Sequence, residues 1–429
     1  MLKRAKRFLT ARTTVLVLIL LVAASLAAAV IVPQDSAGPA APRPALVALL
    51  GLGHVFATRW FATLSVVFGC SLLLSSWDQL KVSRARMAVL PPEGGETGER
   101  CALGRPEVEA LLRREGFRRL AGAPGRSRHV KRWQGYWGNS LLHLGMTLSV
   151  VCALLYVLTE HRVVVRAVSG APVAMAPGSY LERRGILAGP LPLPATLTLF
   201  RLEPEFWEND RLKELGSELI LVDERGDAQE LLVRVSDAQR YRGLLVYQQP
   251  AFGNAFQVEF RNGPRGDFDM RLDLPFPPRR DQAGYGSYPL AEGGLRLAAK
   301  YYAAADRSRM APDDPQLVLR LYDGDRVVGE AALLAGQAGR LGPYDVRFAF
   351  VSWWTDILFE GSLGTVGIFT GFALLMCGGA LTFFAVPREA VVRDGAAGCT
   401  VSFRSTRFPE LYREERARIL ARCKGEVAA

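Results

Sequence analysis

Cysteine and histidine are scarce in this chain, and their absence from one long segment excludes several kinds of chemistry. The 429 residues include six cysteines and four histidines. Residues 160–362 contain no cysteine, so this segment holds no disulfide and carries out no thiol–disulfide exchange. No CxxC, CxxCH or zinc-type spacing occurs in the chain. The same segment has one histidine, His161, and scattered carboxylates such as Asp313 and Asp314, so it lacks a Ser-His-Asp set. These absences argue against a thiol-redox enzyme and leave no self-contained active site.

Acidic residues are absent from the beginning of the sequence. Residues 1–13 contain five Lys and Arg and no Asp or Glu. Residues 78–135 contain 13 basic and 7 acidic residues, and residues 387–429 contain 9 and 6. Residues 160–362, in contrast, contain 24 basic and 28 acidic residues. The net charge of +11 therefore comes from three separate basic segments, which is the pattern of a membrane topology and not of a nucleic-acid surface.

Four apolar runs are long enough to cross a bilayer, for which about 20 residues suffice. They are residues 14–32, 60–77, 136–159 and 363–386. The first run also resembles a signal peptide, because a basic start precedes it and an Ala-rich stretch ends it. Its 19 residues exceed the usual apolar core of such a peptide, which favours an uncleaved span.

The basic segments predict the orientation of these spans, because Lys- and Arg-rich loops stay on the cytoplasmic side. We expect residues 1–13, 78–135 and 387–429 in the cytoplasm, so that both termini lie there. Residues 33–59 are then a short exported loop with an interfacial helix, and residues 160–362 a large exported domain.

Residues 160–362 contain short alternating segments instead of long apolar runs. Turn signals such as Asn262-Gly263 and Asp323-Gly324 separate these segments. Nine of them are predicted as strands: residues 196–202, 218–223, 230–235, 244–248, 255–261, 268–272, 295–301, 317–322 and 346–351. The predicted fold is a membrane protein of four transmembrane α-helices, with a large β-rich, sandwich-like exported domain between the third and the fourth.

Shorter motifs outside the spans give local predictions. Val108, Leu112 and Phe117 can share one face of an amphipathic helix, which the neighbouring arginines would hold near anionic lipid. His129 lies among basic residues and is expected in solvent. Residues 352–356 (SWWTD) are interpreted as an interfacial aromatic anchor. The tail contains a charged amphipathic helix without recognisable chemistry.

The third apolar run contains one side chain that titrates near neutral pH, His143, roughly two turns from its basic end. An ionisable group within a span is costly and is a functional-site hypothesis by default. The alternative is a neutral histidine that is hydrogen-bonded to a neighbouring helix. His54 is expected at the membrane surface and His161 in solvent at the membrane edge, and the sequence assigns a role to neither.

Several stretches resemble the ResB family, a membrane component of the System II machinery for cytochrome c maturation. Four spans with one large exported β-rich domain between the third and the fourth are also the layout of that family. The similar stretches, in chain order, are Val32-Pro33-Gln34, His54-Val55-Phe56 with Arg59-Trp60-Phe61, Gly69-Cys70, residues 137–145 (WGNSLLHLG), Ser217-x-Leu219-x-Leu221-x-Asp223, and residues 241–249 (YRGLLVYQQ). The displaced histidine before the second span, and Ser236-Asp237-Ala238 in place of the family's usual Asn-Pro, indicate a divergent member.

The resemblance implies a component of a complex that handles haem across the bacterial inner membrane and supports its attachment to exported apocytochrome c. The implied partners are a ResC/CcsA-type membrane protein, apocytochrome c and the lipid bilayer, with no nucleic acid. The large domain would lie in the periplasm or on the outer face. This chain would be a non-catalytic or co-catalytic subunit of the haem-attachment (cytochrome c synthase) complex.

The resemblance also implies haem b bound in transit. His143 is the candidate axial ligand of the haem iron, because a neutral imidazole in an apolar span offers a nitrogen to the metal. Lys131 and Arg132 are candidates for the haem propionates. Small neighbours of His143, such as Gly138 and Gly145, are expected to let the flat macrocycle approach the helix.

Two functions of other classes fit the same sequence. One is a membrane-anchored β-domain that acts as an envelope scaffold or sensor without haem, in which His143 is purely structural. The other is a secondary transporter, which the lack of an inverted repeat and of paired charges within the spans makes weak. Haem absorbance of the purified protein distinguishes both from the haem-handling function.

Overall fold

The computed structural model describes residues 2–32, 44–90, 98–264, 266–290, 294–310, 314–395, 398–405 and 407–425. The chain divides into two compact units. The described parts of residues 1–34, 42–158 and 363–429 form the first, here called the helical unit, and residues 159–362 belong to the second, the β unit. The motif Pro33-Gln34, the Pro/Gly-rich residues 91–97 and Asp313 lie outside the described residues.

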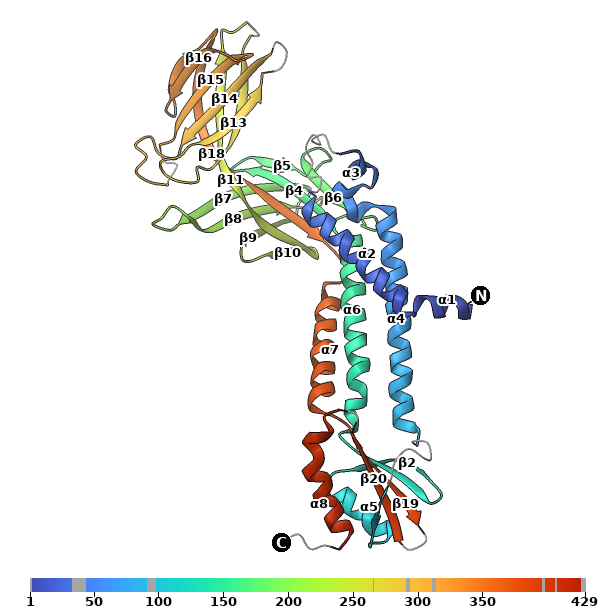
Figure 1. Cartoon of the computed structure of the whole chain (residues 1–429). Coiled ribbons are helices and arrows are strands. Elements are labelled where there is room, and N and C mark those ends of the chain that lie inside the picture. Colours follow the sequence, from blue (N-terminus) through green and yellow to red (C-terminus); the bar gives the residue numbers. More distant parts are fainter. Residues whose placement is uncertain are drawn as a thin grey trace. The chain divides into compact units, whose positions relative to one another are not determined.

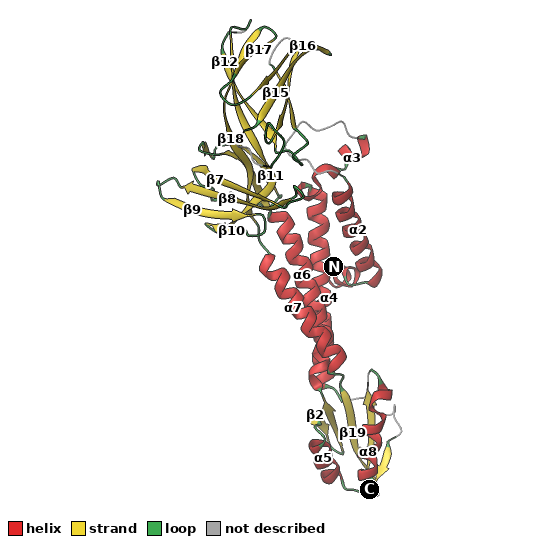
Figure 2. Cartoon of the chain, turned by 90° about the vertical axis from the view of Figure 1, so that its left-hand side faces the viewer, coloured by secondary structure: helices red, strands yellow, loops and turns green. Residues whose placement is uncertain are grey.

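The helical unit contains, within the described ranges, four helices that are long and apolar enough to cross a membrane (Figures 1 and 2). They are α2 (Arg12–Ile31), α4 (Arg59–Ala88), α6 (Gly138–Thr159) and α7 (Thr365–Phe384). Three short helices accompany them: α1 (Leu2–Leu9), α3 (Ala45–Leu49) and the 3-10 helix η1 (Leu52–Ala57). Each long helix overlaps one predicted run. The largest difference is in α4, which continues past residue 77 to Ala88 because Lys, Arg, Gln and Met there favour a helix as well.

Hydroxyl groups join α4 to α6 in antiparallel register. Ser76 Oγ lies 2.6 Å from Thr147 Oγ1, and Ser83 Oγ lies 2.7 Å from Ser140 Oγ. Polar side chains in an apolar helix bond across the helix interface, because neither lipid nor a water molecule satisfies them there. These two pairs, seven residues apart on each helix, fix the contact along two turns.

Glycines hold α6 and α7 in close contact. A Cβ added to Gly371 would lie 2.8 Å from the carbonyl oxygen of Gly145, and one added to Gly378 would lie 2.9 Å from that of Gly138. Two helix backbones can approach this closely only where the residues at the contact are very small. Gly379, in contrast, has no neighbouring atom within 4 Å of an added Cβ.

A five-stranded sheet completes the helical unit, and it combines segments from both sides of the β unit in the sequence. Its order is β1-β20-β19-β3-β2. The strands are β1 (Glu99–Cys101), β2 (Arg118–Ala123), β3 (Arg126–Lys131), β19 (Arg388–Gly395) and β20 (Gly398–Ser405). The helices α5 (Arg105–Arg114) and α8 (Arg413–Cys423) pack on one face of this sheet, and η2 (Trp133–Trp137) and η3 (Pro409–Tyr412) are 3-10 turns beside it.

This small domain corrects three local predictions. Val108, Leu112 and Phe117 are buried against the sheet and α8, so α5 packs on protein and not on lipid. His129 is fully buried within β3, where solvent was expected. The tail forms two strands besides its helix, because β19 pairs with β3 across more than 250 residues of sequence.

Two strands of 18 residues each run antiparallel through the β unit, β11 (Leu244–Arg261) and β18 (Tyr344–Gly361). They lie within a seven-stranded sheet whose main path is β10-β11-β18-β4-β6, with β12 paired to β11 and β17 to β18. Two four-stranded sheets, β13-β14-β15-β16 and β5-β7-β8-β9, complete the unit. The other strands are β4 (His161–Val168), β5 (Pro172–Ala174), β6 (Tyr180–Arg184), β7 (Thr196–Phe206), β8 (Leu212–Val222), β9 (Ala228–Arg234), β10 (Gln239–Tyr241), β12 (Phe268–Pro275), β13 (Gly284–Pro289), β14 (Leu295–Tyr302), β15 (Gln316–Asp323), β16 (Arg326–Leu333) and β17 (Ala338–Leu341).

β11 and β18 run through both lobes of the β unit (Figure 1), and each lobe has a large hydrophobic core of its own. Phe256 and Phe348 belong to the core under β14 and β15, whereas Val246 and Phe359 belong to the core under β7 and β8. All nine predicted strand segments lie in strands to within one residue, because β8 ends before Asp223 and β9 before Val235, and the β-rich character is as predicted. The sandwich-like domain is, however, two sandwich-like lobes built on one pair of strands.

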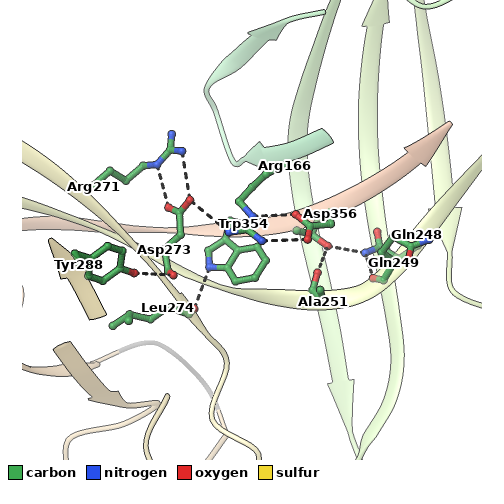
Figure 3. Close-up of polar contacts among 11 residues, drawn as sticks. Arg166, Gln248, Gln249, Ala251, Arg271, Asp273, Leu274, Tyr288, Trp354 and Asp356 are labelled. Atoms are coloured by element: carbon green, nitrogen blue, oxygen red, sulfur yellow. Dashed lines mark hydrogen bonds and ion pairs between the residues drawn. The ribbon is translucent and has the colours of Figure 1, made fainter. Parts of the chain in front are cut away.

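The two lobes meet at a polar junction (Figure 3). Trp354 is 4% exposed, donates from Nε1 to the carbonyl oxygen of Leu274 at 2.9 Å, and stacks under the guanidinium of Arg166, 4.0 Å from the ring centroid. Gln248, where β11 shifts register, donates to Thr355 Oγ1 at 2.6 Å. The prediction of an interfacial aromatic anchor at residues 352–356 is therefore wrong, because these residues lie within β18.

Candidate functional site

A large apolar pocket lies among α2, α4 and α6, within the predicted spans. Its volume is about 500 Å³. This lies within the range of ligand pockets, which is roughly 300–1,000 Å³. Apolar side chains form most of its wall: Val15, Ile19, Val22, Ala23, Leu26, Phe68, Leu72, Met146, Val150, Ala153, Leu154 and Val157. Four polar side chains also line it: Ser75, Ser76, His143 and Thr147. An apolar cavity with few polar groups is the expected form of a site for a flat, mostly apolar ligand.

The imidazole of His143 forms a hydrogen bond within its own helix. Its Nδ1 lies 2.9 Å from the carbonyl oxygen of Asn139, one turn earlier on α6. A carbonyl oxygen only accepts, so Nδ1 carries a proton and is the donor of this hydrogen bond. Metal-binding histidines are commonly oriented by such a bond from the second ring nitrogen. The ring is half-buried and lines the pocket, so that an ion or ligand there can reach it.

The polar neighbours of His143 are satisfied by one another. Ser76 Oγ donates to the carbonyl oxygen of His143 at 3.1 Å and contacts Thr147 Oγ1 at 2.6 Å. Neither of these two contacts of Ser76 involves the imidazole nitrogen Nε2. The alternative of a structural histidine bonded to another helix is therefore not what this geometry shows, because the imidazole bonds within its own helix.

The two cations predicted for the propionates are engaged elsewhere. Lys131 Nζ lies 2.6 Å from Glu415 Oε1 of α8, and Arg132 Nη1 donates to the carbonyl oxygen of Phe384 at 2.7 Å. Neither of them lines the pocket. Their role towards a propionate stays a prediction, and it would require them to leave these partners.

The small residues beside His143 have a different role from the one predicted. Gly138 and Gly145 face α7, where a Cβ on Gly138 would lie 2.7 Å from the backbone nitrogen of Thr382. They leave no space for a macrocycle on that side. The pocket lies on the opposite side, towards α2 and α4, and its wall is formed by larger residues.

The remaining predicted histidines differ from each other. His54 is exposed in η1, as expected for a surface position. His161, at the start of β4, is buried, with Nδ1 2.7 Å from the carbonyl oxygen of Gly189 and Nε2 2.6 Å from Glu182 Oε1. The prediction of a solvated His161 is therefore wrong, because strand pairing within the β unit encloses the ring.

Comparison with known proteins decides the family. The model of the ResB-like family matches residues 11–410, which include all four long helices and the β unit. This chain belongs to the ResB-like family. The chain is also similar to three cyanobacterial proteins named cytochrome c biogenesis protein CcsB.

The sequence identity to these relatives is low, but the similarity extends over most of each chain. The protein of Synechococcus sp. strain JA-3-3Ab is 24% identical over 402 residues, covering 87% of this chain and 78% of its own length. That of strain JA-2-3B'a(2-13) is 24% identical over 364 residues, covering 78% and 71%. That of strain CC9311 is 23% identical over 365 residues, covering 81% and 77%. The recognition of the family from local motifs is confirmed.

Proposed function

We propose that this ResB-like chain acts in cytochrome c maturation by holding haem in transit, in the pocket among α2, α4 and α6. The observation that carries the proposal is His143, whose imidazole ring lines an apolar pocket of about 500 Å³. The names of the relatives support a role in cytochrome c maturation, and the family match covers the residues that line the pocket.

The residues present fit the chemistry of haem. His143 would hold the haem by offering an imidazole nitrogen to the iron, and the apolar wall would keep water away from the macrocycle. The hydrogen bond from Nδ1 to the carbonyl oxygen of Asn139 would orient the imidazole ring for that contact. The hydroxyls of Ser76 and Thr147 bond to each other and remain in the wall, so they do not compete for the metal.

The proposed orientation follows from charge. The basic α1 and the basic five-stranded sheet would lie in the cytoplasm with both termini, and the acidic β unit in the periplasm or on the outer face of the inner membrane. A reporter fused after Gly226 should then be exported and one fused at Ala429 cytoplasmic. Reversal of either location would contradict this orientation.

The proposed partners are a ResC/CcsA-type membrane protein and apocytochrome c. The lipid-facing or partner-facing surface of α7 supports the first, because Val366, Phe369, Phe372, Met376 and Phe383 are all exposed. The β unit would hold the apoprotein or brace the partner. The described residues include no group of three or more His, Cys, Asp or Glu that could hold a metal ion, so the proposed metal chemistry depends on haem itself.

A pocket-filling variant tests the proposal without touching His143. Ala153 lines the pocket, whereas Ala373 of α7 is exposed and lies outside it. Ala153→Phe should abolish haem absorbance of the purified protein and leave its abundance unchanged, and Ala373→Phe should retain both. Equal haem content in the two variants would contradict the proposal, and a wild-type protein without haem absorbance would favour the scaffold or sensor.

A further inference from the structure

Two arginines lie directly opposite each other on the five-stranded sheet. Arg126 of β3 pairs with Arg393 of β19, Arg393 pairs with Thr400 of β20, and Thr400 pairs with Arg100 of β1. Side chains of directly opposed residues share one face, with Cβ atoms about 5 Å apart, and like charges there repel. A row of three cations and one hydroxyl therefore crosses the sheet.

This row lies on the face away from α5. Ser127, which alternates with Arg126 along β3, donates to Glu109 of α5 at 2.7 Å. Arg128, on the same face as Arg126, donates instead to the carbonyl oxygen of Val89, the residue after α4, at 2.7 Å. Because side chains alternate between the two faces of a strand, the carboxylate of Glu109 is separated from Arg126 by the sheet.

The row combines one buried, one half-buried and one exposed arginine: Arg126, Arg393 and Arg100. Arg126 is 8% exposed, and its buried Nε and Nη2 have no hydrogen-bond partner among the residues that the structure describes. Nε of Arg393 and Oγ of Ser402 are likewise buried without a partner. Glu389, a carboxylate on this face, is occupied by Arg128 at 2.9 Å. A buried charge without a partner is costly, so the arrangement lacks an anion.

We propose that this row is a binding site for a phosphate-type oxyanion. Arg126 and Arg393 would supply charged donors, and the hydroxyls of Thr400 and Ser402 neutral ones. The guanidinium fork matches two oxygens of a tetrahedral anion, and one doubly charged anion would neutralise the opposed pair. Dissolved phosphate, a soluble phosphate ester and a phospholipid headgroup all present the same oxygens. The site is separate from the haem pocket and does not depend on the function proposed for it.

The test measures unfolding of the full-length protein in phosphatidylcholine nanodiscs, in sodium phosphate and in sodium chloride of equal pH and ionic strength. An anion that binds only the folded state raises the midpoint of unfolding. We expect phosphate to raise it for the wild type. Arg393→Gln should need at least tenfold more phosphate for the same rise, and in chloride it should be at least as stable as the wild type because the repulsion is gone. Arg118→Gln, an exposed cation of the same sheet, should respond like the wild type.

A second arm identifies the source of the anion. Nanodiscs that contain phosphatidylglycerol are compared in chloride, without phosphate. A rise in the midpoint that Arg393→Gln loses supports a lipid headgroup, whereas a rise in dissolved phosphate alone supports a soluble anion. The proposal is overturned if neither source raises the midpoint, or if the rise is equal in the wild type and Arg393→Gln. It is also overturned if Arg393→Gln and Arg126→Gln are destabilised equally in chloride and phosphate, which is the behaviour of structural arginines.

Discussion

The contact between α6 and α7 predicts a large effect from one methyl group. In the variant Gly371→Ala the new Cβ would lie 2.7 Å from the backbone nitrogen of Ser149 and 2.8 Å from the carbonyl oxygen of Gly145. Ordinary contacts of a Cβ begin at 3.4 Å, so the backbones must separate by about 0.6–0.7 Å. A gap of that size forfeits a quarter to a half of the dispersion energy of the atoms involved. We expect a loss of about 2 kcal/mol in the free energy of unfolding.

The matched control is Gly379→Ala, eight residues further along the same helix. A Cβ there meets no atom within 4 Å, and alanine favours a helix over glycine by about 1 kcal/mol. Gly379→Ala should therefore be neutral or stabilising. The assay is the fraction of folded protein during titration with sodium dodecyl sulfate, starting from mild detergent. Equal midpoints for Gly371→Ala and Gly379→Ala would refute the close contact.

Two further variants test the small domain and the β unit. Burial alone would raise the pKa of Glu109, but hydrogen bonds from Ser127 and Arg105 outweigh burial and hold the pKa below its ordinary value of 4.5. The carboxylate therefore stabilises the fold above pH 4.5, and this stabilisation is lost as the pH falls through the lowered pKa. Glu109→Gln should cost about 2 kcal/mol near pH 7, and a difference from the wild type that does not shrink in acid would show that the charge is unimportant. Trp354→Phe removes the indole donor to the carbonyl oxygen of Leu274 and should cost about 2 kcal/mol by thermal unfolding. The exposed Trp207→Phe should change stability by less than about 0.5 kcal/mol. Similar losses for both would speak against the junction.

Features encoded in neighbouring residues could be predicted from the sequence. The four long helices follow from uninterrupted apolar runs, and nine strand segments follow from alternation and turn signals. Two predicted strands, 244–248 and 255–261, are one strand, β11, because the chain passes Pro250 by a shift in register and not by a turn. Local signals cannot distinguish a bulge from a turn when a proline is present.

Features that depend on distant pairing were not visible in the sequence. β19 and β20 lie more than 250 residues after β3 and β1 in the sequence, and they pair with those two strands and with each other. The burial of His129 follows from the same pairing. His143 was identifiable as an ionisable residue within an apolar run. Its pocket was not, because the wall is assembled from three helices that only the fold brings together.

The most direct test of the haem-binding account is the haem content of the variant His143→Ala, purified from membranes. The imidazole of His143 lines the pocket and is hydrogen-bonded to its own helix, and the contact of Ser76 is to the backbone carbonyl of His143, so loss of the side chain should leave abundance near normal. We predict loss of haem absorbance and of covalent cytochrome c formation, with both partly restored by added imidazole, which is small enough to enter the vacated space. Met146→Ala, in the same wall, should retain haem. Normal haem absorbance in His143→Ala would contradict the account.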